Sequence, residues 1–178
     1  MIHVATPYST DKNLGAAYNN FIKLIPEEDW ICLIDYDVLF LLPQTISHFY
    51  KYIELYPECD LFTCYANRSH ENSRQQLLAG KISSNADMYY HIDLAKKQES
   101  NLYKATELKG NISGFLMILS KKLWNEIKFI DNGKSLGVDT DYSNRLAEKD
   151  KRVYRMDGVY VWHTYRLING VNDKSHLK

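Results

Sequence analysis

Two aspartates, Asp35 and Asp37, stand one residue apart inside the otherwise apolar segment 30–42 (WICLIDYDVLFLL). Aspartate is depleted in strands, and a buried carboxylate is costly unless it is paired with a cation or bound to a metal. Carboxylate oxygens suit Mn²⁺ or Mg²⁺, which often share their ligands between one or two carboxylates and substrate phosphates. The pair therefore predicts a Mn²⁺ or Mg²⁺ site. The alternative is a strand that has ended, leaving two solvated loop carboxylates.

Two further polar residues stand at positions where elements are expected to begin or end. His163 closes the apolar run GVYVW, and a neutral imidazole at a strand end suits a third metal ligand or a phosphate contact. The alternative is an ordinary buried or surface histidine. Asp139 follows Gly137 at the start of an expected helix, where a simple N-terminal cap is the alternative. The Asp-x-Asp pattern recurs as Asp139-Thr140-Asp141, so the pattern alone does not identify a metal site.

The elements that must position these residues alternate in the first third of the chain. Apolar runs bounded by Pro or polar breaks predict strands, and apolar residues three and four apart predict helices. In chain order we expect a strand at 2–6, a helix at 14–25, a strand at 30–42, a helix at 46–53 and a strand at 61–65. This alternation predicts one α/β domain with a mixed, mostly parallel central sheet flanked by helices, whose ligands bind at the carboxyl ends of the strands.

The remainder of the chain is less regular. Residues 67–109 are polar, with a helix expected near 86–97. After them we expect a strand at 112–120, a helix around 123–127, a helix at 139–149, and two short strands at 153–156 and 159–162. Asp157-Gly158 between the last two predicts a hairpin turn. We expect one compact domain over residues 1–166 and a mobile tail over 167–178.

Composition excludes some partners. The chain has 22 Lys+Arg and 22 Asp+Glu in 178 residues, so no global field draws it onto nucleic acid or an anionic membrane. No apolar run approaches the roughly 20 residues of a membrane-spanning helix. The three cysteines are an odd number, and no signal-like segment follows Met1, which together favour a reducing compartment. We therefore expect a cytoplasmic protein without a transmembrane segment or a nucleic-acid partner.

The order of these parts resembles the family 2 glycosyltransferases, which have the GT-A fold, a Rossmann-like α/β domain. The first strand ends in Thr-Pro-Tyr, the segment 13–21 (NLGAAYNNF) is similar to the family's N-x-G-x-x-x-x-R-N helix, and the apolar strand ends in Asp-x-Asp. Segment 112–131 (ISGFLMILSKKLWNEIKFID) resembles the acceptor-side glycine strand and helix. Segment 137–163 is similar to the stretch that runs from Gly-Glu-Asp to Tyr-x-His.

This resemblance implies a metal-dependent glycosyltransferase that moves a sugar from a nucleotide-diphosphate donor, of the UDP or GDP type, to a hydroxyl of a carbohydrate or other acceptor. Asp37 would be the direct ligand of Mn²⁺ or Mg²⁺. Asp35 would contact the ribose, or the metal through water, and His163 would complete the metal shell. Asp139 would be the general base of an inverting transfer, since it matches the aspartate of the family's Glu-Asp pair.

The resemblance also implies binding residues and shows departures. On the donor side, Thr6, Pro7 and Tyr8 would line the base and ribose with Asn13 close by, and Gly114 would lie on the acceptor side. Only residues 8–12 separate the Pro from the Asn, where the family has a helix, a strand with a base-binding aspartate and another helix. The usual Glu before the general base is Val138, and residues 18–20 lack the usual Arg. The sequence leaves open a minimal donor site or a shortened enzyme with weakened nucleotide selectivity.

The polar segment 67–109 lies between the donor half and the acceptor-side strand. Because it carries Tyr89 and Tyr90, whose flat rings suit sugars, we expect it to shape the acceptor cleft. Replacing either tyrosine is expected to weaken acceptor use and to leave nucleotide binding intact.

Two other functions remain open at this stage. A haloacid-dehalogenase-like phosphatase would use Asp35 as nucleophile and Asp37 as acid, with Asp139 and Asp141 as its second carboxylate pair. In that family the motif lies on the first strand, whereas a strand and a helix precede it here, and His163 would have no role. The other alternative is a non-catalytic sugar- or nucleotide-binding module of the same fold.

Overall fold

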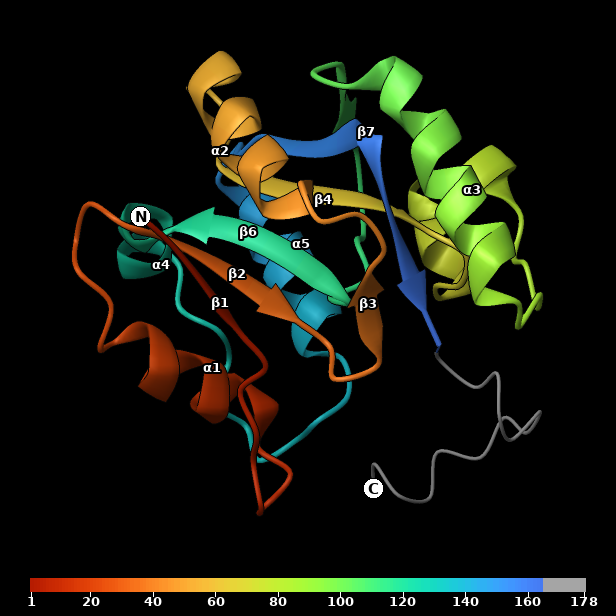
Figure 1. Cartoon of the computed structure of the whole chain (residues 1–178). Helices are drawn as coiled ribbons and strands as arrows, with labels where there is room; N and C mark the ends of the chain where they lie inside the picture. The colour runs from red at the N-terminus through yellow and green to blue at the C-terminus, as the bar shows by residue number, and fades with distance from the viewer. Residues whose placement is uncertain (165–178) are drawn as a thin grey trace.

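A seven-stranded mixed sheet with helices packed on it forms the described part of the protein, residues 1–164 of a computed structural model (Figure 1). The strands are β1 (Ile2–Ala5), β2 (Trp30–Ile34), β3 (Val38–Phe40), β4 (Leu61–Ala66), β5 (Ala105–Leu108), β6 (Leu116–Ser120) and β7 (Val153–His163). The α-helices are α1 (Leu14–Ile22), α2 (Thr45–Leu55), α3 (Met88–Gln98), α4 (Lys121–Glu126) and α5 (Val138–Glu148). Short 3₁₀ helices are η1 (Glu71–Gln76), η2 (Leu78–Gly80) and η3 (Glu99–Asn101).

The strand order across the sheet is β1-β2-β6-β4-β7-β3, and β5 also pairs with β7. β1 is parallel to β2, and β4 is parallel to β7. β6 lies antiparallel between β2 and β4, and both β3 and β5 are antiparallel to β7. Four strands, β1, β2, β4 and β7, therefore point in one direction. The expected α/β class, with a mixed sheet flanked by helices, is confirmed.

Each face of the sheet carries its own hydrophobic core, because side chains alternate between the two faces of a strand. Helices α1, α4 and α5 pack on one face, against side chains such as Ile31 and Leu33 of β2. Helix α2 packs on the other face, where Phe49 and Tyr52 meet Cys32 of the same strand. Burial on both faces explains why the central strands are almost continuously apolar.

Helix α1 is fixed to the segment that follows α4. Asn13 caps the helix by accepting the amide of Ala16, and its side-chain amide donates to Asp131 at 2.6 Å. A Cβ on Gly15 would lie 1.8 Å from the carbonyl oxygen of Ile130, so only glycine permits this backbone approach. The glycine of the NLGAAYNNF segment therefore has a packing role in this fold.

Three expected elements have different forms in the structure. The strand expected at 112–120 begins only at Leu116, because residues 112–115 form a loop. The prediction of one strand over segment 30–42 is wrong, because residues 35–37 form a turn. The Val38 amide donates to the Asp35 carbonyl at 3.2 Å and closes this turn, and β3 then pairs with β7 as the outermost strand on that side of the sheet. The hairpin at residues 157–158 is also wrong, since β7 is one strand whose register against β4 shifts between Cys64 and Tyr65. Strand β5 lies within the polar segment that gave no strand signal.

Within residues 1–164 the structure contains no helix long and apolar enough to cross a membrane. The expected tail at 167–178 lies outside the described residues.

Candidate functional site

The candidate site lies at the carboxyl-terminal edge of the sheet, which is the side where the four strands of common direction (β1, β2, β4 and β7) end. There β2 ends at Ile34, which pairs with Leu116 at the start of β6, and β7 ends at His163, which pairs with Val38 at the start of β3. The antiparallel strands therefore begin where the parallel strands finish. Loops from both sequence halves converge on this edge, which is where α/β folds commonly bind ligands.

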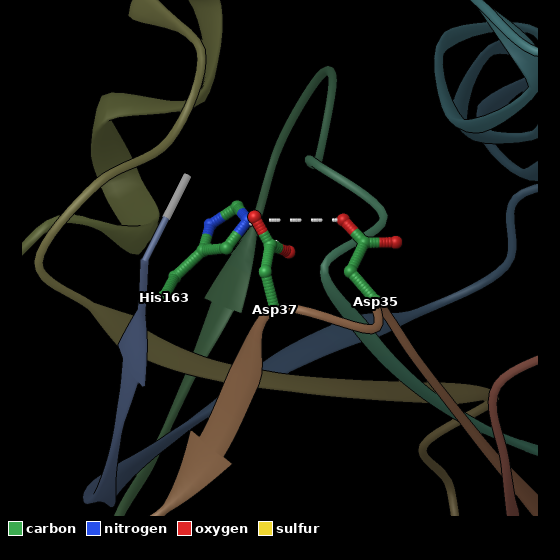
Figure 2. Close-up of side chains that lie close together, drawn as sticks. All are labelled: Asp35, Asp37 and His163. Atoms are coloured by element: carbon green, nitrogen blue, oxygen red, sulfur yellow. Dashed lines mark ion pairs between the residues drawn. The ribbon is translucent and has the colours of Figure 1, made fainter. Parts of the chain in front are cut away.

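Asp35, Asp37 and His163 form a compact cluster at this edge, which we call the candidate metal cluster (Figure 2). The Nε2 atom of His163 lies 3.3 Å from Oδ1 of Asp37 and 3.8 Å from Oδ2 of Asp35. One ligand atom from each residue lies within 4.8 Å of the others. Two carboxylate oxygens and one imidazole nitrogen at this separation are a suitable donor set for Mn²⁺ or Mg²⁺.

The imidazole of His163 is held in one orientation. Its Nδ1 lies 2.9 Å from the carbonyl oxygen of Arg68, which can only accept, so Nδ1 carries the proton. The backbone N–H of His163 donates to the side-chain oxygen of Asn67 at 2.8 Å, and the ring packs on Phe115 with centroids 5.3 Å apart. The residue is only 3% exposed. In its neutral form the ring therefore presents the Nε2 lone pair to the carboxylates, as a metal ligand must.

The backbones of the two aspartates are also fixed. The Asp35 amide donates to the carbonyl of Phe115 at 3.0 Å, and the carbonyl of Asp37 accepts both the amide and the hydroxyl of Thr164. The Asp35 side chain is 38% exposed and that of Asp37 is 15% exposed. Asp35 thus faces the more open side of the cluster, from which a ligand could approach.

Two ionised carboxylates are unfavourable in the candidate metal cluster unless a cation is bound between them. Partial burial raises the pKa of Asp35 to about 6, and the negative charges of Asp37 and Asp139 add to the rise, whereas His163 opposes it. Desolvated carboxylates that repel one another prefer to share a cation. A bound divalent cation would supply the missing positive charge.

The negative charge of Asp139 adds to the rise in the pKa of Asp35, and the Asp139 side chain is bonded to the loop that precedes β6. Its Oδ2 accepts the backbone N–H of Gly114 at 3.0 Å, and its Oδ1 accepts the N–H of Thr140 at 2.8 Å. The capping position of α5 is occupied by Gly137, which has a φ of 81°. Asp139 is thus not the simple N-terminal cap, and its carboxylate is tied to the edge of the sheet.

Asp141 has different partners. Its Oδ2 accepts from Nε of Arg145, one helical turn away, at 2.8 Å, and the same guanidinium donates to the carbonyl of Lys128. The second Asp-x-Asp pattern therefore separates into one carboxylate bonded to the Gly114 amide and one engaged in an ion pair within α5.

The residues expected on the donor side differ in whether their positions suit that role. Residues 6–8 follow β1, whose last residue pairs with Leu33, so they leave the sheet at the edge where Asp35 lies. Tyr8 is exposed there. The side chain of Asn13 caps α1 and binds Asp131, so its amide is already used within the fold.

The expected acceptor-side tyrosines lie on α3. This helix packs on β7 through His91, whose Nδ1 accepts the Tyr160 hydroxyl at 2.7 Å and whose ring stacks on Trp162. Trp162 and His163 are neighbours on β7 and project to opposite faces. Helix α3, which carries Tyr89 and Tyr90 as exposed side chains, therefore covers the face of β7 opposite to the side chain of His163. Figure 1 shows α3 beside β7.

Sequence reasoning missed the residues that support the cluster. Asn67 and Arg68 come directly after β4, and this position at a strand end was the available signal. Phe115, which contacts both His163 and the Asp35 amide, is an ordinary apolar residue in the sequence. Burial raises the pKa of the Tyr18 hydroxyl on α1, and the negative charges of Asp35 and Asp139 add to the rise.

Comparison with known proteins does not place the chain in a family: no protein-family model matches it, and neither does any curated protein. The function must therefore be inferred from the site itself.

Proposed function

We propose that this protein is a metal-dependent glycosyltransferase that moves a sugar from a nucleotide-diphosphate donor to an acceptor hydroxyl. The observation that carries the proposal is the candidate metal cluster, whose ligand atoms lie within 4.8 Å of one another at the ligand-binding edge of an α/β sheet. A further carboxylate, Asp139, is bonded to the loop that also contacts Asp35 and His163. This arrangement supplies the two chemical functions that sugar transfer needs, namely charge stabilisation on the leaving group and removal of a proton from the acceptor.

The residues present fit a divalent cation. Asp37 and His163 are the closest pair, and the imidazole tautomer fixed by Arg68 leaves Nε2 as a ligand atom. Asp35, on the more exposed side, would hold the metal through water or contact the donor ribose. When bound, Mn²⁺ or Mg²⁺ acts as a Lewis acid that neutralises charge on the departing diphosphate.

In this proposal Asp139 is the general base. Each of its oxygens accepts one backbone N–H, so each keeps further lone-pair capacity for an acceptor hydroxyl. The carboxylate takes the hydroxyl proton as the oxygen attacks the anomeric carbon, which inverts that centre. A positioned base typically contributes about 10²- to 10⁴-fold to the rate.

The proposed donor is a UDP- or GDP-type sugar, with residues 6–8 beside its base and ribose. The acceptor is a carbohydrate or another hydroxyl compound on the Gly114 side, and we place the reaction in cytoplasmic polysaccharide biosynthesis. Three buried thiols, Cys32, Cys59 and Cys64, are compatible with a reducing compartment.

One observation favours the transferase over the phosphatase. The phosphatase would need Asp139 and Asp141 as a cooperating pair, but Asp141 is committed to Arg145. The phosphatase also gives no role to His163, which is buried and aimed at both aspartates. A non-catalytic binding module would use the same cluster, and only turnover separates it from the transferase.

A donor screen tests the proposal. The protein with Mn²⁺ is incubated with UDP- and GDP-sugars and a mixture of saccharide acceptors, and release of UDP or GDP is measured with and without EDTA. We expect metal-dependent release coupled to a new glycoside and no hydrolysis of p-nitrophenyl phosphate. Nucleotide binding without any turnover would support the binding module, and metal-dependent phosphomonoester hydrolysis would support the phosphatase.

A further inference from the structure

The loop of residues 111–115, immediately before β6, connects the two halves of the site. The Gly114 amide donates to Asp139, and the Phe115 carbonyl accepts from the Asp35 amide. The ring of Phe115 also packs on His163. The loop thus touches the proposed general base and two members of the candidate metal cluster.

This loop has no regular secondary structure, yet it is anchored along its length. The Ile112 amide donates to the hydroxyl of Ser143 at 3.2 Å, and the Asn111 carbonyl accepts the side-chain amide of Gln75 at 3.0 Å. Ser113 uses both of its backbone groups on one side chain, that of Gln76. A loop whose polar groups are bonded in this way has few alternative conformations.

Gln76 provides the most buried of these anchors. Its Oε1 accepts the Ser113 amide at 2.6 Å, and its Nε2 donates to the Ser113 carbonyl at 3.1 Å and to the Thr63 hydroxyl at 2.7 Å. Both Gln76 and Thr63 are 0% exposed. The N–H of Ser113 can only donate and its C=O can only accept, so these two groups determine the orientation of the Gln76 side-chain amide. The hydroxyl of Thr63 joins the same amide to the central strand β4. The loop is therefore clamped to the sheet through this one side chain.

We propose that Gln76 is a positioning residue, which holds the 111–115 loop so that Asp139 and the candidate metal cluster keep their productive separation. This inference rests on the proposed function. Gln76 itself acts through Ser113 and Gly114 and needs no contact with substrate. The polar segment 67–109 would thereby serve the reaction through its buried face.

The geometry predicts unequal effects on binding and on turnover. Asp37 and His163 are held chiefly by β3–β7 pairing and by Asn67 and Arg68, which lie outside the loop, although the ring of His163 also packs on Phe115. Asp139, by contrast, is bonded directly to the Gly114 amide of the loop. Loss of the clamp should therefore disturb the base more than the metal. Misplacement of a reacting group by about 1 Å can cost on the order of 10²-fold in rate.

The test compares Gln76→Met with Gln98→Met. Gln98 donates to the Asp157 carbonyl at 2.9 Å, so its variant also loses a side-chain-to-backbone bond, but one that does not touch the loop. Amide hydrogen exchange of Gly114 is measured first, because it needs no activity. We expect roughly tenfold or faster exchange in Gln76→Met and no change in the control, since broken buried hydrogen bonds lower the local opening free energy. Unchanged exchange at Gly114 would overturn the clamp.

Kinetics then test the positioning role. We expect kcat to fall about 10- to 100-fold in Gln76→Met, with a smaller change in Mn²⁺-dependent nucleotide affinity. Equal losses in kcat and in nucleotide affinity, or an unchanged kcat, would overturn the positioning role of Gln76. If Gln76→Met does not fold, Thr63→Val replaces it, because it removes one partner of the clamp with little change in volume and should shift both measurements in the same direction. Absence of turnover in the wild type would instead refute the proposed function, and the exchange result would still stand on its own.

Discussion

Asp139→Asn is expected to abolish most sugar transfer and to leave metal-dependent nucleotide binding nearly unchanged. The amide can accept only one of the two backbone N–H bonds that the carboxylate accepts now, from Gly114 and Thr140. The lost bond to a charged acceptor is worth about 1.5–3 kcal/mol of folding stability. The lost base costs about 10²- to 10⁴-fold in rate. The rate effect therefore exceeds what a small loss of folded protein could produce.

Asp141→Asn is the matched control, because it makes the same chemical change two residues away on α5. It removes an ion pair with Arg145, in which both side chains are partly exposed, and such pairs between residues four apart contribute about 0.3–0.5 kcal/mol. We expect its kcat to stay near that of the wild type. Thermal unfolding of both variants is compared with initial rates on the donor and acceptor found in the screen.

The refuting result is near-normal turnover in Asp139→Asn, which would mean that this carboxylate only supports the 111–115 loop. A large loss of kcat in Asp141→Asn would indicate that Asp141 is the general base. Loss of nucleotide binding in Asp139→Asn would show that Asp139 belongs to the donor site.

Three further predictions follow from particular contacts. Gly15→Ala should destabilise the protein by about 3 kcal/mol or cause it to misfold, measured by urea unfolding, because the new methyl would overlap the Ile130 carbonyl; a loss below about 1 kcal/mol would contradict this packing. Gly114→Ala places a Cβ 3.1 Å from that of the proposed base, so kcat should fall more than stability, and parallel losses would contradict a positioning effect. Because α3 covers the other face of β7, Tyr89→Ala or Tyr90→Ala should leave both the KM for acceptor and the nucleotide affinity unchanged, and a raised KM for acceptor alone would restore the acceptor role expected from the sequence.

The candidate metal cluster illustrates what sequence can predict. Asp35 and His163 each follow an apolar run, and a polar residue directly after a buried strand must lie at the sheet edge. The alternation of elements in the first third of the chain indicates strands of common direction, whose ends meet. That His163 completes the same metal site was implied by the family resemblance of segment 137–163, together with its position at the end of an apolar run.

The division of segment 30–42 could not be predicted in the same way. Residues 38–42 are apolar whether they continue β2 or form a separate strand, and periodicity does not distinguish these cases. What decides the structure is the pairing of Val38 with His163, a contact between distant residues. The tight turn at residues 35–37 is what brings both carboxylates to the same point.

Glycine has more than one use in strands, and the sequence does not distinguish between them at Gly158. The Asp-Gly pair predicts a hairpin turn, but a Cβ at this position would lie 2.4 Å from the Cα of Leu102. The glycine therefore permits close backbone approach within a bulged strand. Gln76 gave no signal at all, since a buried amide is recognised only when its partners, Thr63 and Ser113, are known in space.

The most direct test of the central claim is calorimetric titration of Mn²⁺ and of UDP or GDP into the wild type, Asp37→Asn and Asp93→Asn. Asp93 is an exposed aspartate on α3 and controls for the loss of one charge. We predict that the wild type and the Asp93 variant bind one of the nucleotides only with Mn²⁺. Asp37→Asn should lose at least about tenfold in Mn²⁺ affinity, since even outer partners of metal ligands contribute 10- to 100-fold. Nucleotide affinity that is independent of Mn²⁺, or Mn²⁺ affinity that is unchanged in Asp37→Asn, would contradict the account.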